Sequence, residues 1–498
     1  MVRERLGFDA QAPEDPVALE QIELAPARVR APASLAPITS DDPYDRISRA
    51  LGKAYRDIVR GMRGEFPNVP DLVAKPRDEA DVERLLAWCS ETGVAAIPFG
   101  GGTSVCGGIE PRFPREYPGT LTIDLRALNQ LVEVDETSHS ALIEAGAVGP
   151  VLERRLGERG LTLRCYPQSF EFSTLGGWIA TRAGGHFATR QTHVDDLVQS
   201  VRAITPTGAW ESRRLPGSGA GPSPDRLLIG SEGILGVITQ AWVRVRPRPT
   251  IKASRAVAFD SFMAGAGAVR ELSQSGLDPA NCRLLDATEA QFNQAGPPGK
   301  AMLMLGFESA HHPVEADLDV ALEVAAAHGG EPQDTAGKDD DSVGAWRDAF
   351  LAMPYLRDGL ARLGVLSETF ETAITWDRFE ALHSAAMAGA REALGAKATV
   401  SCRFTHVYPD GPAPYFTVLA PARRSSEVEQ WDAVKVAVSE ALINAGGTIT
   451  HHHAVGRDHR PWYDRQRPAP FARALVAAKR ELDPVGILNP GVLIDPAD

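Results

Sequence analysis

The chain has 498 residues, of which 43% are hydrophobic and 23% are charged, values typical of a globular protein with a large core and two to four domains. Its net charge of −13 argues against nucleic acid as the main partner, because phosphate binding needs a basic surface. It has no run of 18 apolar residues and no apolar signal segment, so we expect no membrane span and a cytoplasmic location. The five cysteines are scattered, which favours free thiols over disulfides or a zinc ribbon.

The first 65 residues are predicted to form an arm and a helix. Residues 1–40 are rich in Pro and Ala without strong periodicity, so we expect an extended arm. A helix is predicted over 45–63, where apolar residues such as Ile58 and Met62 recur near one face and the remaining face is basic. We favour a helix docked on its own domain over one lying on a membrane surface.

A glycine-rich segment, Pro98-Phe-Gly-Gly-Gly-Thr-Ser-Val-Cys-Gly-Gly108, is the most distinctive stretch of the chain. A helix over 78–92 and a strand over 94–97 are predicted before it, and a strand over 119–125 after it, so the segment is a tight loop between strands. Its backbone N–H groups and hydroxyls form a site suited to a diphosphate, with a purely structural turn as the alternative. No G-x-G-x-x-G opens a helix here, which excludes a Rossmann fingerprint.

Two further loops of this kind follow, after predicted strands at 131–134 and 140–144 and a helix at 150–160. The second loop covers residues 166–178 and leads into a helix, and the third covers residues 229–238. Three loops that combine glycine with hydroxyl groups within about 140 residues are hard to explain as turns alone. Together they favour one long ligand with a diphosphate and a flat ring.

The composition changes near residues 247–249, where a second domain is predicted to begin. Strands such as 301–308 alternate there with Ala-rich helices such as 314–328. The acidic run 339–341 is interpreted as a solvated turn at a helix start and not as a metal site. The last segment contains a predicted helix over 470–482. We divide the chain into an N-terminal arm and helix (1–65), a ligand-binding domain (66–249), a second domain (250–450) and a returning C-terminal segment (451–498).

Three consecutive histidines, His451 to His453, raise the question of a metal. If they form a strand, His451 and His453 share one face and His452 points to the other. No H-E-x-x-H motif or nearby acidic pair supports a metal site, so we predict none and favour a His452 that faces the ligand. The basic cluster that follows binds a phosphate or forms a solvated loop, and both interpretations stay open; it consists of Arg457, Arg460, Arg465 and Arg467.

Arginines in apolar stretches of the second domain are candidates for anion binding. Arg283, Arg357 and Arg403 fit this description, and an Arg gives the best bidentate grip on a carboxylate or phosphate. Burying such a charge unpaired is costly, although a single Arg is more often a salt-bridge partner than a ligand-binding residue.

These motifs resemble those of the vanillyl-alcohol-oxidase-type family of FAD-binding enzymes and, within it, the alkyldihydroxyacetonephosphate (alkylglycerone-phosphate) synthases. The resemblance runs from about Asp45 to the end of the chain and includes the segments 98–108, 167–178, 230–236, 370–372, 451–456 and 489–490. It implies an α+β fold, with a two-subdomain FAD-binding domain of the PCMH type and an α+β cap domain built on an antiparallel sheet.

The resemblance also implies FAD as the cofactor, with its diphosphate on the first loop. Because no histidine lies in or just before that loop, we expect non-covalent FAD, and a tether through His186 or His193 is not expected. The implied cofactor-binding residues are Pro98, Gly100, Gly101, Gly102, Thr103, Ser104, Pro167, Ser169, Ser173, Thr181, Arg182, Ser231, Glu232, Gly233 and Leu235.

Five residues match the family's catalytic and substrate positions: Arg283, Arg357, Thr369, Tyr415 and His452, with Thr369 standing where the family carries a serine. Tyr415 is implied to be the acid/base phenol. Its ordinary pKa near 10 would need lowering, which Arg283 and His452 could supply. From the sequence alone, a packed aromatic with a surface hydroxyl is the alternative.

The implied reaction exchanges the acyl group of an acyl-dihydroxyacetone phosphate for a fatty alcohol through a flavin adduct, a step of ether lipid synthesis. The implied partners are a small lipid-like substrate with a phosphate or carboxylate, a second copy of the chain in a homodimer, and a membrane contacted peripherally.

The rival function is that of an FAD-linked oxidase or dehydrogenase of a hydroxy acid or related alcohol. Ala454, where the family carries Gly, keeps the rival open, and the His-x-Gly-Asp-Gly-Asn motif of many such dehydrogenases is only partly echoed at residues 406–411. A non-catalytic flavoprotein is disfavoured by the retained Arg, Tyr and His residues.

Overall fold

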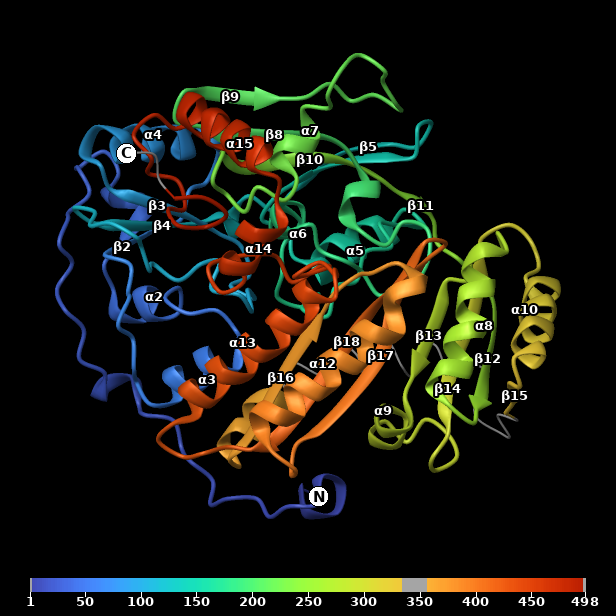
Figure 1. Ribbon diagram of the computed structural model, residues 1–498. Helices are drawn as coiled ribbons and strands as arrows, with labels where there is room; N and C mark the ends of the chain where they lie inside the picture. The colour runs from blue at the N-terminus through green and yellow to red at the C-terminus, as the bar shows by residue number, and fades with distance from the viewer. Residues whose placement is uncertain (1, 334–355, 496–498) are drawn as a thin grey trace.

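A computed structural model describes residues 2–333 and 356–495, and its largest strands gather into two sheets in the first half of the chain and one in the second (Figure 1). The acidic run 339–341 lies outside the described residues. The first sheet has the order β1-β2-β4-β3, with parallel pairing of β4 to β2 and β3. The second has the antiparallel order β5-β6-β10-β8-β9, and β7 pairs separately with β11.

The four strands predicted at 94–97, 119–125, 131–134 and 140–144 are confirmed to within a few residues as β3 to β6. The strands of this first half are β1 Thr39–Ser40, β2 Leu72–Ala74, β3 Ala95–Phe99, β4 Thr120–Asp124, β5 Leu131–Asp135, β6 Ser140–Glu144, β7 Leu161–Thr162, β8 Val198–Thr205, β9 Gly208–Glu211, β10 Val237–Arg244 and β11 Arg246–Pro247. The helices are α1 Val2–Leu6, α2 Pro43–Ile47, α3 Tyr55–Met62, α4 Glu79–Thr92, α5 Gly149–Gly157, α6 Leu175–Thr181 and α7 Asp225–Leu228, with 3-10 turns η1 Leu19–Gln21, η2 Ala36–Ile38, η3 Leu125–Ala127 and η4 Val194–Asp196.

The second half forms one antiparallel sheet of order β15-β12-β14-β13-β17-β18-β16. Its strands are β12 Ile251–Phe259, β13 Asn281–Leu285, β14 Ala301–Ser309, β15 Glu331–Pro332, β16 Val365–Glu371, β17 Thr399–Tyr408 and β18 Gly411–Pro421. The helices of this half are α8 Phe262–Gln274, α9 Ala287–Phe292, α10 Glu315–Ala327, α12 Phe379–Leu394 and α13 Glu427–Asn444, with η5 Trp376–Arg378. The antiparallel sheet and the α+β class are as predicted.

Helices cover one face of this sheet and leave the other for the site. In Figure 1, α12 and α13 lie along the sheet, and α8 and α10 lie beside its β12–β14 edge. Alternate residues such as Cys402, Phe404 and Phe416 point into the apolar core beneath these helices. The residues between them, such as Arg403 and Tyr415, therefore point to the opposite face, toward the first half of the chain.

The N-terminal arm and the C-terminal segment both connect the two halves. The arm binds the second half where Gln11 N donates to Leu363 O at 2.9 Å, and the first where Arg28 pairs with Asp71 at 2.7 Å. The C-terminal segment carries α14 Arg460–Gln466 and α15 Ala469–Leu482 and returns to the first sheet. There Leu488 forms a parallel bridge with Ala96. We propose the domain boundaries predicted at 65, 249 and 450, which the division of the sheets supports.

The prediction of one helix over 45–63 is wrong. The segment forms two helices, α2 and α3, and Gly52 lies between them. A Cβ at Gly52 would lie 2.2 Å from the carbonyl oxygen of Ser104, and Lys53 N donates to that oxygen at 2.7 Å. The chain therefore leaves the helical path to contact the glycine-rich loop. The basic residues of α3 do not form a membrane-binding face, because Arg56 and Arg60 are buried against Glu110.

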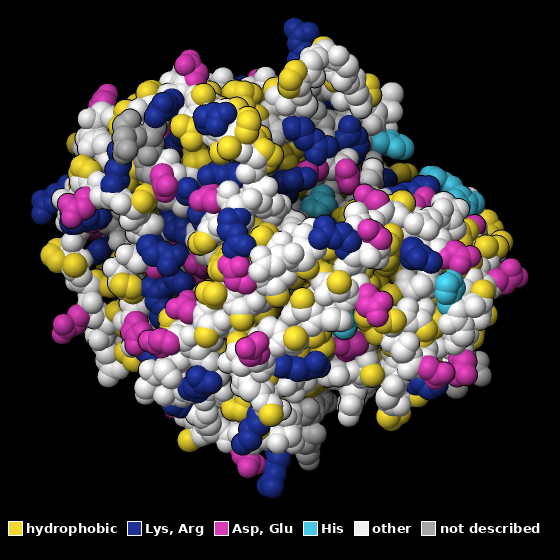
Figure 2. Space-filling model, viewed as in Figure 1, with side chains coloured by type: hydrophobic (Ala, Val, Ile, Leu, Met, Phe, Trp, Pro, Cys, Tyr) yellow, Lys and Arg dark blue, Asp and Glu magenta, His cyan; other side chains and the backbone are white. Residues whose placement is uncertain are grey.

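The surface charges are mixed in sign, and the cysteines are free thiols, as the composition predicts. Basic and acidic side chains are interspersed over the face seen in Figure 2. All five cysteines are buried and free. Among the described residues, no helix combines the length and apolarity needed to cross a bilayer.

We predict that Gly52→Ala destabilises the protein by about 1–3 kcal/mol, the usual cost of forcing an atom into a packed position. The added methyl would overlap the backbone of Ser104, which cannot move aside as a flexible side chain can. Urea unfolding measures the change, and Gly217→Ala is the matched control because open space surrounds that glycine. Equal stability of the two variants would contradict the contact.

Candidate active site

The three glycine-bearing loops pack against one another at the ends of the first two sheets. A Cβ on Gly101 would lie 2.0 Å from the carbonyl oxygen of Phe172, so only glycine lets the first loop approach the second this closely. A Cβ on Gly233, which has φ +78°, would lie 2.9 Å from the ring of Pro98 and thus marks where the third loop meets the first. The loops form one continuous surface, as a single ligand would require.

The first loop offers unused hydrogen-bond donors. The backbone N–H groups from Gly101 to Ser104 have no acceptor among the residues that the structure describes, and Gly102 has φ +68°. The buried Ser231 hydroxyl of the third loop likewise lacks a hydrogen-bond partner within the described parts of the chain. Consecutive N–H groups and a nearby hydroxyl suit an anion such as a diphosphate.

Several predicted cofactor-binding residues use their side chains inside the protein. Ser173 is buried and accepts a hydrogen bond from Trp178 Nε1 at 2.7 Å. Thr181 donates to a carbonyl of its own helix, and the Arg182 guanidinium pairs with Asp195 at 2.8 Å. Leu235 belongs to the apolar core. Gly100 contacts the second loop at Thr174, and Pro167 and Ser169 accept backbone hydrogen bonds in the turn before Ser173.

Three strands of the seven-stranded sheet in the second half place charged and aromatic groups side by side on the face without helices. Arg403 on β17, Tyr415 on β18 and Glu371 on β16 lie directly opposite one another in the register. Thr369 lies two residues before Glu371 on the same face. Arg283 joins them from β13, because it lies two residues before Leu285, the register partner of Arg403.

A bulge in β17 adds a histidine to this face. The register between β17 and β18 shifts between Phe404 and His406, so that His406 lies opposite Ala413. His406 is fully buried and its Nε2 lies 2.8 Å from the carbonyl oxygen of Gly185. Strict alternation would have turned Thr405 to this side instead, so the bulge is what places the imidazole here.

Two buried arginines share the site. Arg283 donates to the carbonyl oxygen of His186 at 3.1 Å, and Arg403 pairs with the buried Glu289 of α9. Burial and repulsion from Arg403 lower the pKa of Arg283 to about 9, although Glu289 partly offsets them. An anionic ligand at this position would relieve that cost.

Tyr415 is fully buried, so the surface-hydroxyl alternative is wrong. Its hydroxyl lies 3.4 Å from Gln168 Oε1 in the second loop, and the Arg403 guanidinium lies 4.0 Å from its ring centre. The expected lowering of its pKa is also wrong: burial raises the pKa of Tyr415, and Arg403 offsets this only in part. The nearby cation is Arg403 instead of the expected Arg283 and His452.

The three histidines do not form a strand, which corrects the alternation predicted for them. Residues 451–453 form a bend, and all three backbone N–H groups donate to the carboxylate of Glu371. The Thr450 hydroxyl donates to it as well. Burial alone would raise the pKa of Glu371, but the imidazoles and the hydrogen-bond donors around it lower the pKa well below the ordinary value. The carboxylate is therefore ionised and fixes the tripeptide.

A second buried carboxylate holds the residues that follow. Glu232 of the third loop accepts from the backbone N–H groups of Val455 and Gly456 at 2.9 and 2.8 Å. Burial raises the pKa of Glu232 to about 7, while these two hydrogen bonds favour its ionised form. Residues 451–456 are thus held between the seven-stranded sheet, through Glu371, and the first half of the chain, through Glu232.

The arginines after the histidines all have partners within the protein and lie in or beside α14 instead of in a solvated loop, while phosphate binding by them stays a prediction. Arg457 is buried and donates to the carbonyl oxygens of Gly107 and Pro490 at 2.9 and 2.7 Å. It therefore joins the first loop to the chain end, where Asn489 also binds the Glu232 carbonyl at 2.7 Å. The other three have protein partners: Arg460 binds Asp464, Arg465 binds Glu440, and Arg467 binds the Leu493 carbonyl.

The remaining predicted catalytic residues lie around this cluster. The ring of His452 is nearly parallel to that of Tyr415, with centroids 6.1 Å apart. Burial lowers the pKa of His452 to about 3, with Glu371 opposing the shift, so the ring is neutral. Thr369 influences the pKa of Tyr415 through a hydrogen bond, and Arg357 does so through its charge. Arg357 is half-buried and donates to the Lys53 carbonyl at 2.9 Å, next to the first loop.

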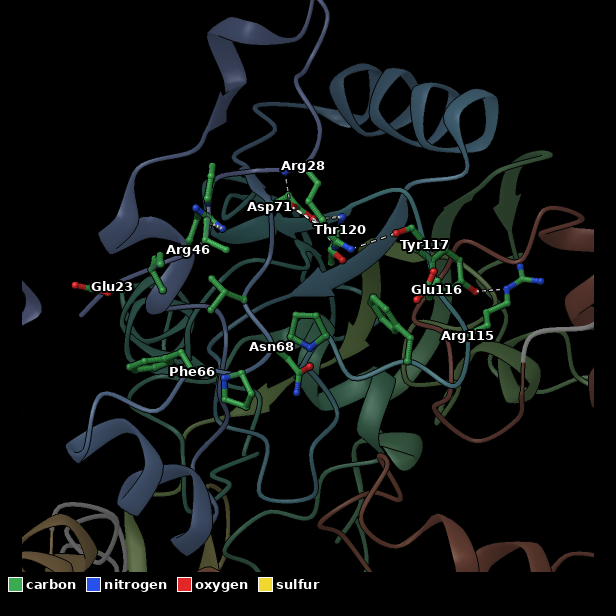
Figure 3. A pocket seen from close by; sticks show the side chains of 17 residues that line it. Glu23, Arg28, Arg46, Phe66, Asn68, Asp71, Arg115, Glu116, Tyr117 and Thr120 are labelled. Atoms are coloured by element: carbon green, nitrogen blue, oxygen red, sulfur yellow. Dashed lines mark hydrogen bonds and ion pairs between the residues drawn. The ribbon is translucent and has the colours of Figure 1, made fainter. Parts of the chain in front are cut away.

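The pocket in Figure 3 is separate from this site. It has a volume of about 350 Å³ and lies under the N-terminal arm, between residues 23–28 and the first sheet. Figure 3 shows Arg28 directed at Asp71 and the Tyr117 carbonyl, where hydrogen bonds already occupy its guanidinium. None of the predicted site residues lines it.

Two family descriptions match the chain, and the second covers the histidine cluster. Residues 70–212 match "FAD binding domain", and residues 248–493 match "FAD linked oxidases, C-terminal domain". The chain belongs to the FAD-linked oxidase family. Its cofactor is FAD, and the unused N–H groups of the first loop and the Ser231 hydroxyl fit the diphosphate of that cofactor.

The similar proteins include enzymes with two different activities. Alkyldihydroxyacetonephosphate synthases from Dictyostelium discoideum and Trypanosoma brucei brucei are 29% and 27% identical, each covering 91% of this chain and 78% of the relative. The glycolate oxidase subunit GlcD from Bacillus subtilis is 28% identical, covering 86% of this chain and 89% of the relative. A solved alkyldihydroxyacetonephosphate synthase superposes with a TM-score of 0.82 at 25% identity, covering 98% of this chain and 91% of that one. A solved p-cresol methylhydroxylase superposes with a TM-score of 0.73 at 16% identity, covering 92% of this chain and 94% of that one, and shares the fold.

Three residues of the cluster were absent from the residues predicted for the site. They are Glu371, Glu289 and His406, which are distant in sequence from the glycine loops. Glu371 and His406 lie in the segments 370–372 and 406–411, but neither segment gave them a role in the site. Glu371 stands in a strand with ordinary alternation, so only its position opposite Tyr415 reveals its role. The composition of β16 gave no signal, because the strand also contains Ser367, Glu368 and Thr369.

We predict that Glu371→Gln lowers the free energy of unfolding at neutral pH by on the order of 3 kcal/mol, because hydrogen bonds to a charged acceptor contribute about 1.5–3 kcal/mol each. The folded-state pKa of Glu371 lies below its unfolded value of about 4.3, so its stabilisation is complete above the unfolded value and is lost as the pH falls from there toward the folded-state pKa. Urea unfolding of both proteins from neutral to acid pH measures the difference. The exposed Glu380→Gln variant is the control, and a difference independent of pH would contradict the ionised carboxylate.

Proposed function

We propose that this FAD enzyme is an alkyldihydroxyacetonephosphate synthase. It exchanges the acyl group of an acyl-dihydroxyacetone phosphate for a fatty alcohol, so that an ether forms and a fatty acid leaves. The synthases align over 91% of the chain, compared with 86% for the glycolate oxidase subunit. The solved synthase also superposes more closely than p-cresol methylhydroxylase does.

The similarity to the synthases carries this proposal, and a pair of buried arginines on the seven-stranded sheet of the second half supports it. The lowered pKa of Arg283 means that burial destabilises its charge, even with Glu289 nearby. A carboxylate placed between Arg283 and the loops would favour the charged form of this buried guanidinium. We assign Arg283 to the carboxylate that leaves as fatty acid, and Arg357, on the more open side, to the substrate phosphate.

Tyr415 and His452 divide the acid and base roles between them. Burial keeps Tyr415 protonated, so it enters the reaction as a hydrogen donor, close enough to Arg403 for the charge to support proton release. Burial keeps His452 neutral, so it enters as an acceptor for the proton of the incoming alcohol. Two titratable groups whose environments push their protonation states apart form a typical acid–base pair.

The cofactor and the remaining residues complete the site. FAD, when bound, supplies an electron-accepting ring, and the protein supplies positioning and electrostatics. The cofactor-binding residues of the three loops hold it without a covalent tether, and the Thr369 hydroxyl orients the substrate. We include in the proposal a homodimer in the cytoplasm that contacts membranes peripherally, because the long-chain substrates reside there.

The second candidate is an FAD-linked oxidase of a 2-hydroxy acid. The 28% identity with the glycolate oxidase subunit favours it. A 2-hydroxy acid carries a carboxylate that Arg283 could also bind, so the arginine alone does not separate the two activities. The fate of the substrate does separate them, because the synthase changes no oxidation state overall.

We predict that the FAD-loaded protein, mixed with palmitoyl-dihydroxyacetone phosphate and hexadecanol without oxygen, releases palmitate and forms the alkyl ether in equal amounts. Mass spectrometry of both products measures the exchange. Glycolate or D-lactate with an electron-accepting dye is the parallel assay for the oxidase. Dye reduction without ether formation would overturn the synthase proposal in favour of the second candidate.

We predict that Tyr415→Phe retains bound FAD and loses turnover by about 10²-fold or more, the usual contribution of a general acid. Only the hydroxyl is removed, so the packing against Arg403 is preserved. Steady-state ether formation and the flavin absorbance measure the two properties separately. Tyr44→Phe is the control, since Tyr44 is 62% exposed and outside the site; unchanged turnover of Tyr415→Phe would remove Tyr415 from the mechanism.

A further inference from the structure

A chain of hydrogen-bonded imidazoles leads from His452 toward the edge of the site. His452 Nδ1 lies 3.0 Å from His451 Nδ1, and His451 Nε2 lies 3.0 Å from His193 Nε2. The chain ends where His193 Nδ1 lies 3.0 Å from the carbonyl oxygen of Arg182. His193 is half-buried, and it precedes η4 in the first half of the chain.

The carbonyl at the end of the chain determines where each proton lies. A carbonyl oxygen only accepts, so His193 carries its proton on Nδ1 and presents Nε2 as an acceptor. His451 must then donate from Nε2, which leaves its Nδ1 as an acceptor for the Nδ1–H of His452. Burial lowers the pKa of all three rings, so each is neutral and carries a single proton. His452 is consequently left with an unprotonated Nε2.

Two neighbouring groups agree with this arrangement. Glu371 Oε2 lies 3.5 Å from His452 Nδ1 and favours a proton on that nitrogen. The Tyr408 hydroxyl lies 2.7 Å from His451 Nε2 and 2.8 Å from Thr192 Oγ1, so it can accept from His451 while donating to Thr192. Burial raises the pKa of Tyr408 and keeps it protonated for that role.

We propose that His451 and His193 are positioning residues that hold His452 in the Nδ1–H tautomer and carry the proton that His452 takes up. The inference rests on the proposed function, since it assigns the His452 Nε2 to the hydroxyl proton of the incoming alcohol. When Nε2 accepts that proton, the Nδ1 proton passes to His451 Nδ1, and the Nε2 proton of His451 passes to His193 Nε2. The positive charge then resides on His193, the third ring of the chain counted from the reacting atoms. The transfer moves protons only and involves no oxidation or reduction.

A metal ion is the competing use of these rings. Nitrogen atoms of His406, His451 and His452 lie within 4.8 Å of one another, close enough to share an ion. An ion would have to displace the bond between His451 and His452. Every nitrogen pair of the chain already matches a donor with an acceptor, so the observations favour the relay.

The tautomers can be measured directly on the FAD-loaded protein with 15N-labelled histidine. We expect two-bond 15N–1H correlations to show Nδ1–H for His452 and His193 and Nε2–H for His451, with single His→Gln variants assigning the signals. An Nε2–H tautomer at His452 would overturn the proposal. Loss of these N–H patterns on adding Co²⁺, with a visible cobalt absorption band, would overturn it in favour of a metal site.

The relay itself is tested by His193→Ala, which removes the end of the chain without touching substrate. We expect turnover to fall about tenfold or more, less than the about 10²–10⁴-fold cost of losing a general base itself. Added imidazole should restore part of the loss with KM unchanged, which a merely structural defect would not allow. The exposed His311→Ala variant is the control. Unchanged turnover in His193→Ala would overturn the relay.

The outcomes separate this inference from the proposed function. If the tautomers are as expected but the wild-type protein forms no ether, the synthase proposal fails and the tautomer assignment stands. If ether forms while His452 shows the opposite tautomer, the synthase proposal stands and the relay fails.

Discussion

The site depends on one buried carboxylate that accepts hydrogen bonds from three consecutive backbone N–H groups. Glu371 extends from β16, at the edge of the seven-stranded sheet. It fixes residues 451–453, which come from a segment 80 positions later in the chain. Buried N–H groups need acceptors, and an ionised carboxylate is the strongest that a side chain offers. The imidazoles are therefore oriented by their backbone, before any contact among the side chains is considered.

The same segment is held from the other side by Glu232, and this double clamp ties the cap to the flavin loops. Arg457 and Asn489 extend the clamp by binding the carbonyl groups of the first and third loops. Contacts of this kind make the position of the cap sheet relative to the loops a single arrangement. A cofactor ring placed by the loops would then meet Tyr415, Arg283 and His452 without further adjustment, which is the preorganisation that electrostatic catalysis requires.

Burial decides the chemistry of this cluster more than charge does. The same loss of solvent that keeps Tyr415 protonated keeps His452 neutral, so the pair holds a donor and an acceptor at one pH. It also lowers the pKa of Arg283 to about 9. The residue types predict that nearby cations lower the pKa of Tyr415. Burial raises that pKa by more than Arg403 lowers it.

The sequence by itself predicted the three glycine-bearing loops and several of the strands, because glycines, hydroxyls and apolar periodicity are local properties. The α+β class and the FAD cofactor came from the resemblance that these motifs carry. Only the tertiary structure decided how residues 451–453 are presented, which residues surround Tyr415, and that Arg457 is a structural clamp. Each of these depends on pairing between distant segments: the β17 bulge that turns His406 inward, the register that sets Glu371 beside Tyr415, and the close approach of Gly52 to Ser104 that divides a predicted helix in two. Local periodicity carries no information about such partners, since the sequence does not distinguish a glutamate that will be buried from one that will be exposed.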